Sequence, residues 1–501
     1  MAELTNEALY ARGLEVIPGG VNSPVRAFRS VGGTPYFVAR GDGAHVWDVE
    51  GRRFIDYVQS YGASILGHAH PAVLAAVADA ASRGTTFGAP TEGEVRLAEE
   101  LCARVPGMEQ VRLVSSGTEA VMSAVRLARG ATGRSTIVKF AGMYHGHSDA
   151  LLAAGGSGVA DQGLSGSDGV TAGAVADTVV VPWNVVPELD ESVAVLCVEP
   201  VAANMGLVPA AEGFLDELRA ECDRVGALLL FDEVITGFRL GPGGATARFG
   251  VRPDLWTFGK VIGGGLPVGA FGASAEIMSH LAPLGGVYQA GTLSGNPLAT
   301  AAGLTVLEHL TPAAFAQLDA TAARLAIGLQ DAFDQAGVAA VVPRVGPLIG
   351  LFFGAEAPVD YDGAKRSVDL GCYPTFFHSM IDDGIALAGA LKETGFDFVC
   401  VSSGANSLAA KIPTGPGYQV HLAEAVKKAT GILTRAVGLI ATPAQAEEVL
   451  ERGAADQIAI GRAFLDNPRW GWHAADALGF SRIVGLTGVF HRRAGERASG
   501  K

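Results

Sequence analysis

Between about residues 95 and 310, short apolar runs alternate with segments of helical period, and this alternation constrains the fold more than any other feature. The stretch EQVRLVSSGTEAVMSAVRLARG predicts a strand, a turn of small residues and a helix, and GFLDELRAECDRVGA predicts another helix. Three further runs predict buried strands, namely STIVKF, AVLCVEPV and ALLLFDEV. Apolar strands joined through helices are typical of a mostly parallel sheet covered by helices on both faces. We therefore predict an α/β fold.

Two flanking regions differ from this pattern and are predicted to form a second, smaller domain. Residues 1–60 predict a lead-in helix and short strands, and residues 301–388 predict a long helix followed by strands. The large domain then spans residues 61–300. Residues 155–175 are rich in glycine and serine, which is compatible with a mobile lid or with a solvated loop.

Composition and charge argue against several classes of function. The 501 residues carry a formal charge of −14, so neither nucleic acid nor an anionic membrane is expected as a partner. No apolar run reaches about 20 residues, and the polar, acidic N-terminal stretch predicts no secretory leader. The five cysteines are scattered without CxxC spacing. We therefore expect neither a disulfide framework nor a metal site, and a cytosolic location.

Lys260 is the most conspicuous candidate for chemistry. It stands between an apolar aromatic run and several glycines in DLWTFGKVIGGGLPVGAFGA, and only Lys139 and Lys365 join it in the first 388 residues. A desolvated lysine can lose its proton and attack a carbonyl, which arginine cannot do. Lys139 lies inside a predicted strand and Lys365 in a polar turn, so both are poorer candidates.

Other polar groups fall at the C-terminal ends of predicted strands, where open parallel sheets bind their ligands. Asp232 ends LLLFDEV, and a carboxylate after five apolar residues requires a partner, either in a structural ion pair or in a functional site. Ser116, Gly117 and Thr118 form a turn into a helix, whose free N–H groups could hold a phosphate. An ordinary helix cap explains the same three residues.

Two more groups of residues extend this pattern. Tyr144 and His145 follow STIVKF, where an aromatic face could cover a flat ring, although a half-buried aromatic is common at strand ends. Gly291 and Thr292 in QAGTLSGNPLA offer a second possible phosphate contact. Taken with the lysine and the aspartate, these residues suit one ligand with a phosphate, a protonated ring nitrogen and an aldehyde. Pyridoxal phosphate carries all three.

Seven motifs stand in the order of a known family: PGGVNSPVRAF, GHAHP, SSGTEA, YHGHSDALLAAGGSGVA, FDEVITGFR, GKVIGGGLPVGAFG and GTLSGNP. From about residue 3 to 388 the chain resembles the glutamate-1-semialdehyde 2,1-aminomutases, which are fold-type-I pyridoxal-phosphate enzymes related to the class III aminotransferases. GGVNSPVRAF is the specific motif, since related aminotransferases share mainly the DEV, GK and GTLSGNP pieces. The resemblance implies a cytoplasmic homodimer that converts glutamate-1-semialdehyde to 5-aminolevulinate, starting from the pyridoxamine form of the cofactor.

The resemblance also implies a role for each candidate residue. Lys260 would bind the cofactor aldehyde covalently, Asp232 would hold its ring nitrogen, and Thr292 would reach the phosphate of the neighbouring subunit. The guanidinium of Arg26 suits the substrate carboxylate. Further cofactor contacts would come from Ser116, Gly117, Thr118, Tyr144, His145, Asn204, Val234 and Gly291, and further substrate contacts from Ser23, Tyr61 and Ser157. The loop 155–175 would keep the diamine intermediate from escaping.

After residue 388 the chain departs from this family. Residues 389–480 resemble the last three βα units of an Old Yellow Enzyme type flavin reductase, a TIM barrel, and residues 481–501 are predicted to be a frayed tail. By that resemblance Gly438, Gly461 and Arg462 would belong to a flavin phosphate site. Three units cannot close a barrel, so we expect no flavin to bind and interpret the segment as a fusion tail.

Three alternative functions stay open at this point. A class III ω-aminotransferase would require an external amino donor. A chimera impaired by its replaced C-terminus would bind the cofactor without turnover. A flavin-dependent reductase would be coloured by its flavin.

Overall fold

The computed structural model describes residues 4–153, 167–383, 398–401, 420–430, 433–436, 440–455, 457–459 and 489–491. The chain divides into two compact units. The first consists of Met1–Ala27, Thr34–Ile327 and Val341–Ser367, and the second of Phe28–Gly33, Gly328–Ala340 and Val368–Lys501.

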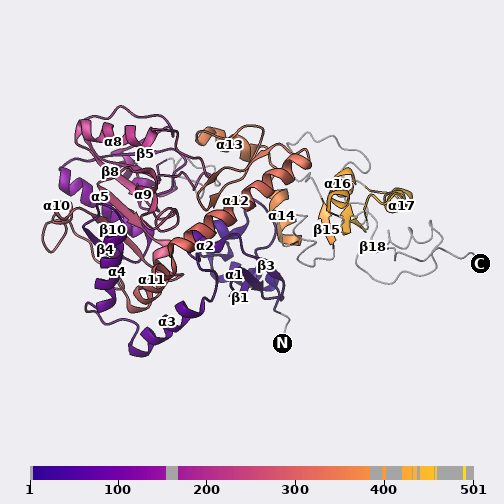
Figure 1. The fold of residues 1–501 in the computed structure, drawn as a ribbon, viewed down its shortest axis with the longest axis horizontal. Helices are drawn as coiled ribbons and strands as arrows, with labels where there is room; N and C mark the ends of the chain where they lie inside the picture. The colour runs from indigo at the N-terminus through magenta and orange to yellow at the C-terminus, as the bar shows by residue number, and fades with distance from the viewer. Residues whose placement is uncertain are drawn as a thin grey trace, which may run out of the picture. The chain divides into compact units, whose positions relative to one another are not determined.

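A seven-stranded mixed sheet lies at the centre of the first unit (Figure 1). Its order is β4 (Gln110–Val114), β10 (Gly269–Ala273), β9 (Leu255–Phe258), β8 (Leu228–Asp232), β7 (Val193–Val198), β5 (Thr136–Phe140) and β6 (Thr178–Val181). The prediction of a mostly parallel sheet is confirmed, with β10 as the exception, because it runs antiparallel to β4 and β9. Residues 259–268, which join β9 to β10, are too few for the crossover that a parallel neighbour needs.

Helices cover both faces of this sheet, as the apolar strands predict. Helix α5 (Gly117–Thr132) shares one hydrophobic core with Cys197 of β7, and helix α8 (Phe214–Val225) shares another with Leu196 of the same strand. Successive residues of a strand point to opposite faces, so every residue of β7 is buried.

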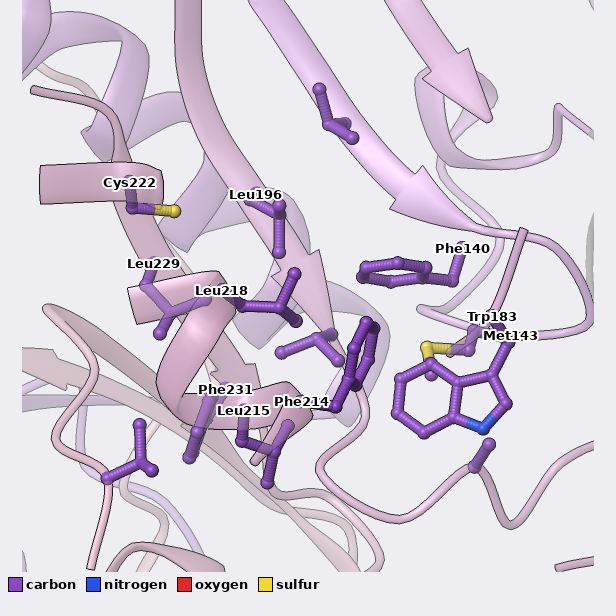
Figure 2. Close-up of a cluster of buried hydrophobic side chains, with 14 of the residues drawn as sticks. Phe140, Met143, Trp183, Leu196, Phe214, Leu215, Leu218, Cys222, Leu229 and Phe231 are labelled. Atoms are coloured by element: carbon purple, nitrogen blue, oxygen red, sulfur yellow. The ribbon is translucent and has the colours of Figure 1, made fainter. Parts of the chain in front are cut away.

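An aromatic cluster anchors the core on the α8 face (Figure 2). The rings of Phe140, Trp183 and Phe214 meet edge to face, with centroids 4.9 to 5.7 Å apart. This arrangement is the preferred one for aromatic pairs. It fixes the C-terminal end of β5, from which the segment carrying Tyr144 and His145 departs.

Capping residues determine where the helices near the site begin. The Ser116 hydroxyl accepts the backbone N–H of Glu119 at 3.2 Å and starts α5.

Helix α11 (Pro297–His309) ends before Pro312, which opens helix α12 (Pro312–Gln335). The single long helix predicted after residue 301 is therefore wrong: it is two helices, because proline has no N–H and favours the first turn of a new helix.

Further helices and strands lie outside this seven-stranded sheet. A three-stranded antiparallel sheet follows helix α1 (Asn6–Val16), as predicted for residues 1–60. Its strands are β1 (Val38–Asp42), β2 (His45–Asp48) and β3 (Arg53–Ile55). Further helices are α2 (Gln59–Gly62), α3 (Pro71–Arg83), α4 (Glu92–Arg104), α7 (Ala172–Val175), α9 (Gly244–Phe249), α10 (Ala275–Met278) and α13 (Tyr361–Asp369), and short strands are β11 (Ala340–Val341), β12 (Arg344–Val345), β13 (Leu348–Ile349) and β14 (Phe352–Phe353).

The second unit contains helix α14 (Tyr373–Asp383) and a four-stranded sheet. The strands are β15 (Phe398–Val401), β16 (Leu433–Ala436), β17 (Gln457–Ala459) and β18 (Val489–His491), with helices α16 (Val420–Thr430) and α17 (Pro443–Glu451) between the first three. Strands β15, β16 and β17 are parallel, which fits βα units, while their likeness to a flavin-reductase barrel stays a prediction. Strand β18 pairs with β17 in the region predicted as a frayed tail. Gly438, Gly461 and Arg462 lie outside the described residues.

Two further features are absent from the described part of the chain. No helix there combines the length and the apolar character that crossing a bilayer requires. The same residues contain no group of three or more His, Cys, Asp or Glu side chains arranged to hold a metal ion.

Candidate active site

One cavity of about 220 Å³ gathers the polar residues that follow β4, β5, β7, β8 and β9. Eight of the residues predicted from the sequence line it: Ser116, Gly117, Thr118, Tyr144, Asn204, Asp232, Val234 and Lys260. They come together because the C-terminal ends of parallel strands share one edge of the sheet.

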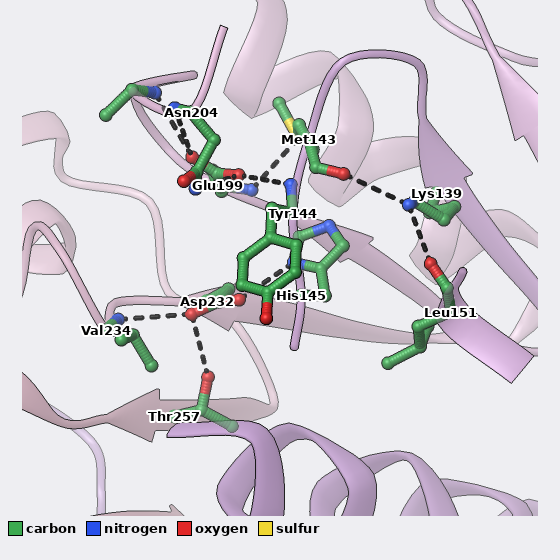
Figure 3. A network of polar contacts seen from close by, with 11 residues as sticks. Lys139, Met143, Tyr144, His145, Leu151, Glu199, Asn204, Asp232, Val234 and Thr257 are labelled. Carbon is green, nitrogen blue, oxygen red and sulfur yellow. Dashed lines mark hydrogen bonds and ion pairs between the residues drawn. The ribbon is translucent and has the colours of Figure 1, made fainter. Parts of the chain in front are cut away.

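Asp232 is the last residue of β8 and is buried. Its Oδ2 lies 2.8 Å from Nδ1 of His145, and its Oδ1 accepts the backbone N–H of Val234 at 3.1 Å and the hydroxyl of Thr257 at 3.3 Å (Figure 3). A carboxylate with bonds on both oxygens is held in one orientation. The partner that the sequence required is therefore a histidine, which was predicted for a different role.

His145 is buried beside Asp232 and does not itself line the cavity. Its Nδ1 engages the aspartate, while its Nε2 is buried and has no hydrogen-bond partner among the described residues. Tyr144, the preceding residue, does line the cavity, and burial raises the pKa of its phenol. The segment after β5 thus supplies an aromatic ring to the cavity and an imidazole to the carboxylate.

Lys260 follows β9 and occupies the left-handed backbone region with φ of 47°. Residues other than glycine rarely adopt this backbone conformation, and residues that do so are concentrated at functional sites. Burial lowers the pKa of the Lys260 amine, although the charges of Asp232 and Glu199 act in the opposite sense. Lys260 therefore has a strained backbone conformation, and its lowered pKa increases the fraction of the neutral, nucleophilic amine.

Glycines give the start of α5 its close approach to the neighbouring segments. A Cβ on Gly117 would lie 3.1 Å from both methyl groups of Val234. Gly146 has φ of 83°, and a Cβ there would lie 2.7 Å from Cα of Thr118. The helix N-terminus consequently presents bare backbone N–H groups to the cavity, an arrangement that suits an anion such as a phosphate.

Glu199 lines the same cavity and was missed in the sequence. It follows β7 at the end of AVLCVEPV, so the signal that revealed Asp232, a carboxylate after an apolar run, was present there too. Its Oε1 accepts the backbone N–H of Tyr144 and the side-chain amide of Asn204, each at 2.8 Å. Glu199 therefore connects two residues predicted to contact the cofactor.

The other predicted residues lie away from the cavity lining. Ser23 is half-buried, and Arg26 and Tyr61 are exposed. Burial raises the pKa of Tyr61 and the charge of Arg26 opposes this, so these two residues lie near each other. A Cβ on the next residue, Gly62, would be 3.6 Å from Cδ of Lys260.

The remaining predicted residues give less information. Gly291 and Thr292 are exposed and do not line the cavity within the single chain. Ser157 and most of the predicted gate at 155–175 lie outside the described residues.

The residues present fit pyridoxal phosphate. The backbone N–H groups at the start of α5 suit the phosphate, since Gly117 has no side chain to cover them and Val234 crowds the position of a Cβ there. The fixed carboxylate of Asp232 suits a protonated ring nitrogen, and the amine of Lys260 suits an aldehyde. All three lie around one cavity, next to the ring of Tyr144.

The mixed sheet with this lysine, carboxylate and helix N-terminus defines a fold-type-I enzyme of the aminotransferase kind. The chain belongs to the aminotransferase class-III family, whose profile matches residues 28–394. It is 52% identical over 399 residues to the glutamate-1-semialdehyde 2,1-aminomutase of Herminiimonas arsenicoxydans, covering 78% of this chain and 93% of the relative.

Solved structures show the same similarity. An omega-transaminase from Sphaerobacter thermophilus is 35% identical with a TM-score of 0.69, covering 76% of this chain and 90% of the transaminase. A substituted glutamate-1-semialdehyde-aminomutase from Pseudomonas aeruginosa PAO1, solved in complex with PMP, is 28% identical with a TM-score of 0.67, covering 76% of this chain and 87% of that one.

Proposed function

We propose that this chain converts glutamate-1-semialdehyde to 5-aminolevulinate, with pyridoxal 5′-phosphate and its pyridoxamine form as cofactor. The observation that carries the proposal is the convergence of Lys260 and Asp232 on one cavity, in a chain that is 52% identical to an aminomutase of this activity. Substrate and product are isomers, so the reaction balances without any external amine.

The bound cofactor supplies an electron sink that stabilises negative charge on the carbon next to the transferred nitrogen. The chain's own residues orient the cofactor and move protons. Asp232, fixed by His145, keeps the proton on the ring nitrogen. The Lys260 amine would take a proton from the carbon on one side of the transferred nitrogen and return it to the carbon on the other side. The N-terminus of α5 holds the phosphate.

Substrate recognition belongs to the same proposal. Arg26 binds the substrate carboxylate with help from Ser23, and Tyr61 borders the site because Gly62 lies against Lys260. The resemblance alone supports two further parts of this proposal, namely Ser157 as a substrate contact and the loop 155–175 as a gate.

The test is turnover with glutamate-1-semialdehyde as the sole added amine. The account predicts formation of 5-aminolevulinate by the protein loaded with pyridoxamine phosphate, and none by Lys260→Ala. A strict requirement for a second amino compound would contradict the proposal.

A second candidate is an ω-aminotransferase, which the 35% identity to an omega-transaminase favours. The discriminating measurement adds an amine donor and a keto acid without the semialdehyde. Transfer between those two compounds at a rate above that of the isomerisation would select this candidate. Cofactor binding without turnover of any substrate would instead select a chimera impaired by its C-terminal segment.

We also propose that the protein is a homodimer. Leu284, Tyr288 and Leu293 are 77%, 71% and 53% exposed within one short segment, more apolar surface than a lone chain usually leaves in contact with water. Thr292 belongs to the same segment, which suits its expected contact with the neighbouring subunit's phosphate.

The domain division and the location complete the proposal. Residues 61–300 form the cofactor domain, residues 1–60 and 301–388 form a small domain, and residues 389–480 form an added βα segment with a tail at 481–501. Cys102, Cys197, Cys222 and Cys372 are unpaired, which suits the reducing cytosol.

A further inference from the structure

One peptide unit beside the cavity lies between two buried, oppositely charged side chains (Figure 3). The carbonyl oxygen of Met143 accepts a hydrogen bond from Nζ of Lys139 at 3.0 Å. The N–H of Tyr144 donates to Oε1 of Glu199 at 2.8 Å. Because these two atoms belong to the same peptide group, the lysine and the glutamate hold its two ends.

Lys139 is 0% exposed and lies on β5. Besides Met143, its ammonium donates to the carbonyl oxygens of Leu151 at 3.0 Å and Ala153 at 3.4 Å. Within the described part of the chain it forms no ion pair with a carboxylate. Burying a cation costs free energy unless opposite charges or hydrogen bonds compensate it. A lysine at this position therefore indicates a role that an apolar residue could not fill.

Glu199 is 3% exposed, and among the described residues the hydrogen bonds to its carboxylate come from N–H groups. Its Oε1 takes the Tyr144 N–H and the Asn204 side-chain amide, and its Oε2 takes the backbone N–H groups of Ala203 at 3.1 Å and Asn204 at 3.3 Å. Four donors on two oxygens leave no position for a proton, so the geometry fits the carboxylate anion.

We propose that Lys139 and Glu199 are a pair of positioning residues that act through the Met143–Tyr144 peptide. A peptide group carries partial negative charge on oxygen and partial positive charge on hydrogen, so the cation and the anion each meet the end of opposite sign. The two charges compensate each other through the polarised peptide between them.

The consequence falls on the two residues that follow this peptide. Tyr144 supplies the ring that lines the cavity, and His145 holds Asp232. Fixing the peptide plane fixes the start of both side chains. Lys139 also holds the far end of the same segment through Leu151 and Ala153. We call the hold of Lys139 and Glu199 on the Met143–Tyr144 peptide the clamp. Its expected effect on catalysis rests on the proposed function, whereas the clamp itself can be measured without substrate.

The experiment compares Lys139→Met, Glu199→Gln and the double variant in the full-length protein loaded with pyridoxal phosphate. The control is Val138→Ala, on the same strand but facing the α8 core, which lowers stability without touching the clamp. Hydrogen–deuterium exchange, resolved to single amides, measures the exchange rate of the Tyr144 N–H. Circular dichroism of the cofactor band reads the environment of its ring. Lys139→Gln, which keeps a donor, replaces Lys139→Met if that variant does not fold.

The clamp predicts that each single variant speeds exchange at the Tyr144 amide by about tenfold or more and weakens the cofactor dichroism, while Val138→Ala leaves both unchanged. It further predicts that the double variant is perturbed less than the product of the single effects, since it leaves no buried charge uncompensated. Multiplicative effects, or exchange at Tyr144 that is unchanged in both single variants, would overturn the inference. A wild type that forms no 5-aminolevulinate, in a series of variants whose exchange and dichroism shift as expected, would count against the proposed function instead and leave the inference standing.

Discussion

Nδ1 of His145 lies 2.8 Å from Oδ2 of Asp232, and both side chains are buried. The histidine comes from the segment after β5 and the aspartate from the end of β8, so the contact joins two strands of the central sheet. Because the other carboxylate oxygen is held by Val234 and Thr257, the acid cannot rotate away from the cavity. This fixed carboxylate is the element on which the proposed cofactor chemistry depends.

Asp232→Asn should lower kcat by about 100-fold or more, the size of effect expected when a preorganised electrostatic group is removed. The amide keeps the shape but cannot hold a proton on the ring nitrogen as an anion does. Steady-state kinetics of the loaded protein measure the change. Asp254→Asn is the matched control, because Asp254 ends no active-site strand and instead pairs with Arg219 at 2.6 Å. Equal losses in the two variants would contradict the assignment.

Gly146→Ala should weaken cofactor binding as well as stability. Its Cβ would stand 2.7 Å from Cα of Thr118, so the start of α5 must shift, and a left-handed alanine adds a cost of about 1–2 kcal/mol. Gly133→Ala shares the conformation, with φ of 69°, but meets no atom within 4 Å, so it isolates the backbone cost. Spectroscopic titration with pyridoxal phosphate should show weaker binding for Gly146→Ala alone. Identical affinities in the two variants would contradict a phosphate site at the start of α5.

The stability of the protein should depend on pH through Lys139. Burial lowers the pKa of this amine from 10.5 to about 8, although the charge of Glu199 acts in the opposite sense. Between pH 8 and 10.5 the folded protein releases this proton before the unfolded chain does, so the unfolded state binds more protons and stability rises with pH.

Urea unfolding of the wild type and of Lys139→Met measures this effect as a difference. The wild type should gain up to about 1.4 kcal/mol per pH unit relative to the variant within that window, and nothing below it. A difference in the free energy of unfolding that stays constant or falls as the pH rises would contradict a lowered pKa for the buried Lys139.

Leu284→Glu should shift the protein from dimer to monomer. A charge in the exposed apolar segment that contains Tyr288 and Leu293 would oppose its burial against a second copy. Val16→Glu is the control, since Val16 is equally exposed but lies on α1. Sedimentation velocity distinguishes the two states. A wild type that is monomeric at all accessible concentrations would refute the dimer.

Much of the central sheet could be predicted because its strands are buried on both faces and appear as continuous apolar runs. Asp232 and Lys260 could be found for the same reason, since each interrupts such a run or follows it. The antiparallel direction of β10 escaped prediction, although the short link 259–268 carried the necessary signal.

The rest of the site depends on contacts between distant parts of the chain. The role of Lys139 could not be predicted from its place inside a strand, because no pattern in the sequence reveals three carbonyl oxygens from Met143, Leu151 and Ala153 around its amine. The pairing of His145 with Asp232 spans 87 residues and was likewise invisible. Glu199 could have been found by the rule that identified Asp232.

The most direct test of the account is borohydride reduction of the protein loaded with pyridoxal phosphate, followed by peptide mass spectrometry. We expect a single pyridoxyl group on the peptide that contains Lys260, and no labelled peptide in Lys260→Arg. A label on Lys139 or Lys365, or a label that survives the substitution, would contradict it.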